Sequence, residues 1–194
     1  MAMLEEGDIV FQQSQSPQSV AIREATGSSW THVGVVVTER GATRIVEAGN
    51  NGVALTSVAA FVNASRDNRM VVMRLKSAEE HFTPEGRETF RSALKRDYGK
   101  RYDRLFEWSD VRIYCSQLVW RAYEASFNLS IGEVQRVEDL NFNRPAVQAL
   151  INERYGLSRA ELTRSSLLQE KIITPLAIKE SNLLETVFDG VVTD

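Results

Sequence analysis

The 194-residue chain contains one cysteine, two histidines and four prolines, and it lacks any long hydrophobic run. A single cysteine excludes an internal disulfide, so packing must hold the fold together and Cys115 is free for chemistry. Apolar stretches such as residues 33–37 are far shorter than the roughly 20 residues that span a bilayer, so we expect no membrane span. Two histidines and one cysteine without paired ligand spacing argue against zinc, and we expect neither a metal nor a cofactor.

The chain also lacks a strong excess of charge of one sign. Its formal net charge is -3, and no run of lysines or arginines stands out. We therefore expect no nucleic-acid partner, because phosphate backbones attract concentrated positive charge. Residues 1–6 have neither the basic nor the apolar region of a secretory signal. A lone thiol fits a reducing compartment, so we expect a cytoplasmic protein, with export as the alternative if a signal segment has been removed.

What is present is the composition of a folded globular protein, with 43% apolar and 25% charged residues. This length fits one domain of ordinary size. We expect a single domain over residues 1–194, with a largely helical extension from about residue 145. The sequence gives no indication of oligomeric state.

Local patterns predict an α+β fold, in which a small antiparallel sheet packs against helices. Strand patterns rich in β-branched and apolar residues occupy 7–11, 31–38, 43–48, 70–75 and 186–192. Helical patterns occupy 19–26, 83–98, 146–154 and 159–172, and another helix begins at Cys115. We expect a loop over 99–113, and residues 53–62 show no clear period.

Cys115 is the first candidate for chemistry. At or near the first turn of a helix, its sulfur lies close to unpaired backbone N–H groups, which favour the thiolate form. A cysteine on a helix is nevertheless more often an inert buried residue. Its position alone therefore does not establish a reactive thiol.

His32 is the second candidate. Strand alternation places His32, Gly34 and Val36 on one face, and the missing side chain of Gly34 predicts open space beside the imidazole. A histidine at the start of an apolar strand is, taken alone, more often a core residue. His81 is the one rival base, because the chain has no third histidine.

Glu47 is the third candidate, because it interrupts an apolar strand. If the turn of the hairpin is centred between Glu39 and Arg40, His32 and Glu47 face each other directly. Their Cβ atoms would then lie roughly 4.5–5.5 Å apart, so the carboxylate could accept a hydrogen bond from the ring. That is the orienting role in a nucleophile–base–acid triad, although an odd loop or a bulge would break this register.

Five segments resemble the YiiX/YebB-like branch of circularly permuted, NlpC-type papain-like cysteine hydrolases. They are 7–11 (Gly-Asp-Ile-Val-Phe), 31–34 (Thr-His-Val-Gly), 46–48 (Val-Glu-Ala), 98–103 (Tyr-Gly-Lys-Arg-Tyr-Asp) and 114–120 (Tyr-Cys-Ser-Gln-Leu-Val-Trp). In most papain-like enzymes the cysteine-bearing helix precedes the histidine-bearing sheet, whereas here the order is reversed, as in the permuted branch. The resemblance covers about residues 7–145.

The resemblance implies a permuted papain-like fold with Cys115 as nucleophile, His32 as general base and Glu47 as the group that orients it. It also implies that Tyr114 and Tyr102 line the substrate pocket, and that the backbone N–H of Cys115 contributes to an oxyanion hole. The implied activity is cleavage of an amide or ester in a small molecule, a peptide or an acyl-lipid.

Two alternatives remain open at this point. The first is a lipid-directed acyl hydrolase or acyltransferase, which predicts an apolar groove near Cys115 with Trp30, Phe106 and Trp108 as lining residues. The second is a non-catalytic module that binds lipid or peptide. It predicts that Cys115→Ala leaves binding intact and that nothing is turned over.

Overall fold

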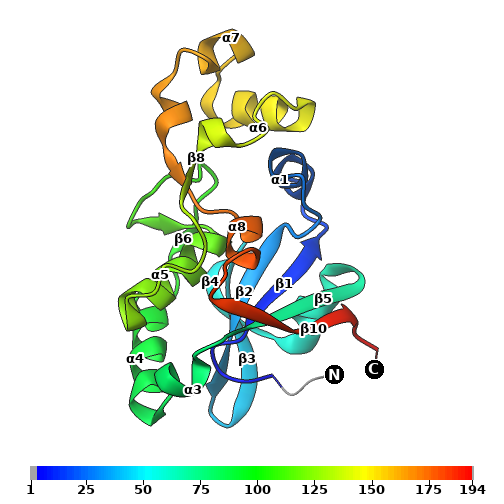
Figure 1. Cartoon of the computed structure of the whole chain (residues 1–194). Coiled ribbons are helices and arrows are strands. Elements are labelled where there is room, and N and C mark those ends of the chain that lie inside the picture. Colours follow the sequence, from blue (N-terminus) through cyan, green and yellow to red (C-terminus); the bar gives the residue numbers. More distant parts are fainter. Residues whose placement is uncertain (1–3, 194) are drawn as a thin grey trace.

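The computed structural model describes residues 4–193, which form an antiparallel sheet with helices on both faces and a helical subregion at one end (Figure 1). The strands are β1 (Ile9–Ser14), β2 (His32–Glu39), β3 (Ala42–Gly49), β4 (Gly52–Ser57), β5 (Ser65–Leu75), β6 (Arg101–Tyr102), β7 (Arg112–Ile113), β8 (Gln135–Arg136), β9 (Lys171–Ile172) and β10 (Leu184–Val191). The α-helices are α1 (Ser19–Thr26), α2 (Val58–Asn63), α3 (Ala78–His81), α4 (Pro84–Lys95), α5 (Cys115–Phe127), α6 (Pro145–Tyr155), α7 (Arg159–Leu162) and α8 (Pro175–Lys179). Two 3₁₀ turns, η1 (Val137–Asp139) and η2 (Ser166–Gln169), complete the set. No helix in the described part of the chain has the length and apolar character needed to cross a membrane.

The main sheet has six antiparallel strands in the order β10-β5-β1-β2-β3-β4. The edge strands are β4 and β10, and β10, which is the last strand in the chain, closes one edge beside β5. Two minor ladders lie outside it, a parallel β6–β7 pair and an antiparallel β8–β9 pair. The predicted antiparallel sheet is therefore confirmed.

Strand alternation gives the sheet two apolar faces. One face carries the alternate β2 residues Val33, Val35 and Val37, which are buried with α4 and α5 in the largest core cluster. Val36 and its neighbours point the other way and pack against α2. A third cluster joins α1 to α6 and α7. The helix that begins at Cys115 thus packs directly on the central strands.

The turn of the β2–β3 hairpin is centred one residue later in the chain than predicted, which shifts the pairing of the two strands by two residues. Glu39 pairs with Ala42, so the two turn residues are Arg40 and Gly41, with φ of 51° and 76°. Positive φ at both positions is what a two-residue hairpin turn requires, and Gly41 adopts it without steric cost. The predicted centre between Glu39 and Arg40 is wrong, because the two residues with positive φ, Arg40 and Gly41, are the two central residues of the turn.

His32 and Glu47 are consequently not directly opposite each other. The observed register places Glu47 across from Gly34, and a Cβ on Gly34 would lie 3.3 Å from the Cβ of Glu47. A shift of two residues still keeps both side chains on the same face, because side chains alternate with a period of two. The space above Gly34, predicted to be open, is filled by Glu47 and by Ile45.

Several short elements differ from the sequence prediction. Residues 53–62 form most of β4 and α2, α4 ends at Lys95 and not near residue 98, and the loop over 99–113 contains β6 and β7. The predicted helix over 159–172 ends at Leu162. Ser165 then accepts a hydrogen bond from the N–H of Leu167 and starts a 3₁₀ turn. Serine side chains compete with helix hydrogen bonds in this way, which explains the early stop.

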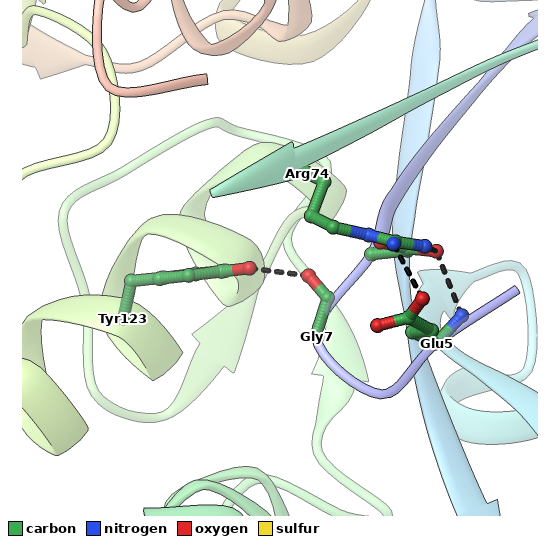
Figure 2. A network of polar contacts seen from close by, with 5 residues as sticks. Glu5, Gly7, Arg74 and Tyr123 are labelled. Atoms are coloured by element: carbon green, nitrogen blue, oxygen red, sulfur yellow. Dashed lines mark hydrogen bonds and ion pairs between the residues drawn. The ribbon is translucent and has the colours of Figure 1, made fainter. Parts of the chain in front are cut away.

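The segment 7–11 is anchored to the core by polar contacts. The carboxylate of Asp8 is buried and accepts hydrogen bonds from the guanidinium of Arg74 and from the N–H of Glu5. Figure 2 shows Arg74 beside Glu5, and the hydroxyl of Tyr123 donating to the carbonyl of Gly7. These contacts tie the start of β1 to β5 and to α5.

Candidate active site

The candidate site is built at the N-terminus of α5. Cys115 is the first residue of that helix, as predicted, and only 3% of its surface is exposed. The sulfur accepts hydrogen bonds from the backbone N–H groups of Val33 on β2 and Ser116 on α5. Packing of α5 on the sheet therefore brings the thiol against the central strand.

His32 lies where β2 and β3 separate. The ladder between these strands ends at the Val35–Val46 pair, and His32 is three residues further along β2. Its Nε2 lies 2.5 Å from a carboxylate oxygen of Glu47, and its ring also hydrogen-bonds the Cys115 side chain. With Glu47 at Nε2, Nδ1 is the nitrogen left to face the sulfur. The three side chains thus form a continuous hydrogen-bonded chain.

The charges in this chain favour an ion pair. Burial alone would raise the pKa of the Cys115 thiol, but the positive charge of His32 and the hydrogen bonds from the ring and the backbone outweigh burial and lower this pKa. Burial alone would lower the pKa of His32, whereas the negative charges of Cys115 and Glu47 raise it well above 6.5. Both shifts favour the pair of thiolate and imidazolium over the pair of neutral thiol and neutral imidazole.

Glu47 is held on the far side of the imidazole. Burial would raise the pKa of its carboxyl group, but hydrogen bonds from His32 and Thr56 lower this pKa, so the group stays ionised. The ring of Phe61 on α2 lies 5.9 Å from the imidazole ring, centre to centre. This aromatic side chain limits the space into which His32 could rotate.

Tyr102 lies next to the thiol and lines a polar cavity together with His32 and Glu47. Its hydroxyl accepts a hydrogen bond of 2.9 Å from Nε2 of Gln18 and interacts with the Cys115 side chain. Burial, reinforced by the charge of Cys115, raises the pKa of Tyr102. The phenol therefore keeps its proton and can donate it in a hydrogen bond to the thiolate.

Tyr114 and Trp30 differ in their relation to the site. Tyr114 is the N-cap residue of α5, is 1% exposed, and accepts a hydrogen bond from the N–H of Ile173 through its hydroxyl. Trp30 is partly buried against the main core and lines neither of the two cavities beside Cys115. The structure thus places Tyr114 in the cavity wall to which Cys115 also belongs, and it does not place Trp30 there.

Two cavities of opposite character flank this site, one at Cys115 and one at His32. The apolar cavity is lined by Cys115, Tyr114 and Phe106, together with side chains from α1, α6 and residues 137–175. The polar cavity is lined by His32, Glu47, Tyr102 and further residues, namely Gln12, Ser14, Ser16, Gln18, Gly49, Asn50, Asn51, Gly52, Ala54, Leu55, Thr56 and Ala64. The thiol and the imidazole thus lie between an apolar and a polar compartment.

His81 takes no part in this site. Its Nδ1 hydrogen-bonds the carbonyl of Ser77, and its ring packs edge-on against Phe127 at 5.2 Å. Phe127 is the last residue of α5, and at 1.5 Å per residue it lies roughly 18 Å along the helix from Cys115. The structure leaves His32 as the histidine that contacts the thiol.

Sequence reasoning missed Gln12, Gln18 and Thr56. Gln12 pairs with His32 across the β1–β2 ladder and is 3% exposed. The only feature of the sequence that could have indicated Gln12 is that a polar residue follows directly on an apolar strand segment. Gln18 and Thr56 carry no signal of their own, because they reach the site from a loop and from the stretch without a clear period.

Known proteins resemble this chain over nearly its whole length. It is 33% identical over 181 residues to the uncharacterized protein YiiX of Escherichia coli strain K12, which covers 93% of this chain and 84% of that protein. The crystal structure of the metalloprotein yiiX from Escherichia coli O157:H7 is 32% identical and matches with a TM-score of 0.86, covering 97% of this chain and 98% of that one.

The donor groups near the thiol decide whether this chain could hold a metal ion there. Within residues 4–193, no cluster of three or more His, Cys, Asp and Glu side chains has a geometry that could hold a metal ion. His32 hydrogen-bonds Glu47 on one side and Cys115 on the other, so its ring nitrogens are already engaged. The residues near the thiol therefore do not fit a metal ion.

A family model gives the identity that these features indicate. The model of permuted papain-like amidase enzymes, the YaeF/YiiX, C92 family, matches residues 3–174. The match continues past residue 145, where the segments that carry the sequence resemblance end. The α+β fold with its antiparallel sheet agrees with the predicted permuted papain-like fold, and the amidase family agrees with a cysteine hydrolase. The chain belongs to the permuted papain-like amidase family.

Proposed function

We propose that the protein is a cysteine hydrolase that cleaves an amide or ester through an acyl-enzyme on Cys115. His32 acts as the general base and acid. Glu47 orients the imidazole and stabilises its protonated form. The observation that carries this proposal is the hydrogen-bonded chain from Glu47 through His32 to Cys115 at the N-terminus of α5. Such a chain supplies an ionised nucleophile beside a proton donor.

The reaction follows from the positions of these groups. The Cys115 thiolate attacks the carbonyl carbon, and the oxyanion is stabilised by the free backbone N–H groups of the first turn of α5. The His32 imidazolium gives its proton to the leaving amine or alcohol as the tetrahedral intermediate collapses to a thioester. His32, now neutral, takes a proton from water as the water attacks the thioester. Release of the acid restores the thiolate and the imidazolium.

Tyr102 and Tyr114 bind the substrate in this proposal. Tyr102 offers a protonated hydroxyl next to the thiolate, where it can donate to a substrate oxygen. Tyr114 presents its ring to the apolar cavity, with its hydroxyl already engaged by Ile173. The two tyrosines would thus define the polar and the apolar sides of the bound substrate.

The apolar cavity supports an acyl chain as the group transferred to Cys115. Its wall is made almost wholly of hydrocarbon side chains, and Cys115 is part of it. A hydrocarbon chain buried there would gain about 0.8 kcal/mol per methylene. Phe106, expected as a lining residue for a lipid substrate, lies in this wall, whereas Trp108 packs against Trp120.

The test uses p-nitrophenyl acetate and p-nitrophenyl dodecanoate as acyl donors. We expect a burst of p-nitrophenolate and an intact-mass increase equal to one acyl group. The rate constant for dodecanoate should exceed that for acetate by about tenfold or more, because several methylenes are buried. Cys115→Ala should give neither burst nor mass increase.

Each other result has a definite meaning. Acylation of the Cys115→Ala variant would refute Cys115 as the nucleophile. Equal rates with both esters would refute the acyl chain in the apolar cavity and leave the hydrolase proposal standing. If p-nitrophenyl dodecanoate binds equally well to the wild type and to Cys115→Ala and neither protein turns it over, the protein is a binding module and the hydrolase proposal is refuted.

Glu47→Gln should lower the rate constant for acylation by p-nitrophenyl dodecanoate about 10-fold to 100-fold. The amide keeps the shape of the carboxylate but removes its charge, and a hydrogen bond to a charged partner contributes about 1.5–3 kcal/mol. A stopped-flow measurement of p-nitrophenolate release checks this. Glu39→Gln at the exposed hairpin end is the matched control and should react like the wild type. A Glu47→Gln rate equal to that of the control would refute the orienting role.

A further inference from the structure

A positively charged hollow adjoins the candidate active site. Its walls are Asn50, Asn51, Gly52 and Tyr102, together with three arginines, Arg101, Arg104 and Arg112. Hereafter we call it the arginine pocket. Three guanidinium groups around one hollow are unusual in a chain whose formal net charge is -3.

The arginine pocket is continuous with the polar cavity. Residues 50–52 and Tyr102 belong to the walls of both. Tyr102 also interacts with the Cys115 side chain, so one aromatic side chain separates the arginine pocket from the thiol. A molecule whose scissile bond lies at Cys115 can therefore extend past Tyr102 into the arginine pocket.

The three arginines lack partners of opposite charge. Across residues 4–193, no carboxylate forms an ion pair with Arg101, Arg104 or Arg112, and all three are exposed. Two carboxylates close to them, Glu47 in the adjoining polar cavity and Asp103 beside Arg104 in the chain, are engaged elsewhere. Glu47 is bonded to His32, and Asp103 is fully buried and accepts a hydrogen bond from the N–H of Leu105. The positive charge of the pocket is thus free to act on a ligand.

The minor ladder β6–β7 brings two of these charges together. Arg101 and Arg112 are direct partners in that parallel pair. Like charges in such positions repel each other and destabilise the pair. An anion between them would remove this cost, and guanidinium groups suit carboxylate and phosphate oxygens through paired N–H donors.

We propose that the arginine pocket binds an anionic group, a carboxylate or a phosphate, on the leaving portion of the substrate. This rests on the proposed function, in which the acyl portion occupies the apolar cavity at Cys115. The substrate is then an acyl amide or ester whose amine or alcohol carries a negative charge. Arg101, Arg104 and Arg112 determine the specificity for that charge.

The test compares two alkylating reagents of nearly equal size, iodoacetate and iodoacetamide, at low ionic strength. The ratio of their rate constants at Cys115 reports how strongly the site attracts an anion, because iodoacetamide is the neutral reference in each protein. We expect this ratio to fall by roughly threefold to tenfold in the triple variant Arg101→Gln/Arg104→Gln/Arg112→Gln. The imidazolium of His32 is present in both proteins, so the change belongs to the arginines.

A matched control removes the same charge elsewhere. Arg44→Gln/Arg96→Gln/Arg159→Gln replaces three exposed arginines that line neither pocket, and its ratio should equal that of the wild type. A triple pocket variant with the control's ratio would overturn the proposal. If iodoacetamide reacts with wild-type Cys115 no faster than with free cysteine, the result counts against the proposed function. The ratio of the iodoacetate and iodoacetamide rate constants would still test the arginine pocket, because it does not require an activated thiol.

Competition distinguishes the two anions. Inorganic phosphate and acetate, compared at equal ionic strength, should slow iodoacetate in the wild type more than in the pocket variant. The stronger competitor identifies the group as phosphate or carboxylate. If neither competes, the arginines only steer charged molecules, and the binding site is refuted.

Discussion

In the variant His32→Ala, the rate constant for alkylation of Cys115 by iodoacetamide at pH 7 should fall about tenfold or more. The imidazolium is the group that lowers the pKa of the buried thiol. Without it, only the backbone N–H groups of Val33 and Ser116 oppose the effect of burial, so we expect the pKa of Cys115 to rise to at least the ordinary value of about 8.5, with only a small fraction of the thiol ionised at pH 7. The measurement is the alkylation rate as a function of pH, followed by intact mass.

The sign of the pH dependence is fixed by these shifts. In the wild type the thiolate persists below pH 8.5, because the pKa of Cys115 is lowered, and reactivity is lost only as the pH falls through that lowered pKa. In His32→Ala, the rate constant for alkylation of Cys115 should rise only above about pH 8.5. His81→Ala is the matched control and should retain the wild-type profile, since His81 contacts Ser77 and Phe127 instead. Identical profiles for His32→Ala and His81→Ala would mean that no ion pair forms.

Gly7→Ala should lower the free energy of unfolding by about 2–5 kcal/mol. Gly7 has φ of 90°, and a Cβ there would lie 2.1 Å from the ring of Phe82. Phe82 is 6% exposed and packs against Phe90, Tyr123 and Phe127, so it has little room to move. Both the strained backbone and the overpacked core destabilise the fold.

The control for this variant is Gly41→Ala, measured by the same urea unfolding. Gly41 also has a positive φ, of 76°, but nothing lies within 4 Å of a Cβ at that position. The control therefore carries the backbone cost alone, about 1–2 kcal/mol. If both variants lose the same stability, Phe82 moves aside freely and the contact with Gly7 does not constrain the core.

Three positions of the candidate site could be predicted from local sequence patterns, whereas Tyr102 and Tyr114 were implied only by the family resemblance. Cys115, His32 and Glu47 lie in patterns that fix the helix start and the strand faces, and these features depend on neighbours in the chain. The hairpin register was wrong by two residues, yet the side chains still met because a shift of two preserves the face. A shift of one would have separated them.

The surroundings of the thiol could not be predicted in the same way. Gln18 and Thr56 reach Tyr102 and Glu47 from segments without a periodic pattern. The contact of Cys115 with His32 depends on the packing of α5 against the sheet, near the point where the β2–β3 ladder ends at the Val35–Val46 pair. No local propensity encodes such a contact.

The sequence by itself determined the class of fold and the three residues of the hydrogen-bonded chain, because alternation, helix capping and residue chemistry act over a few neighbouring positions. The tertiary structure alone decided that an apolar cavity opens on Cys115 and that three arginines converge on the other side of Tyr102. Their walls join residues more than 100 positions apart in the first case and about 60 in the second. Such contacts depend on how whole elements pack, and packing is a property of the folded chain and not of any one segment.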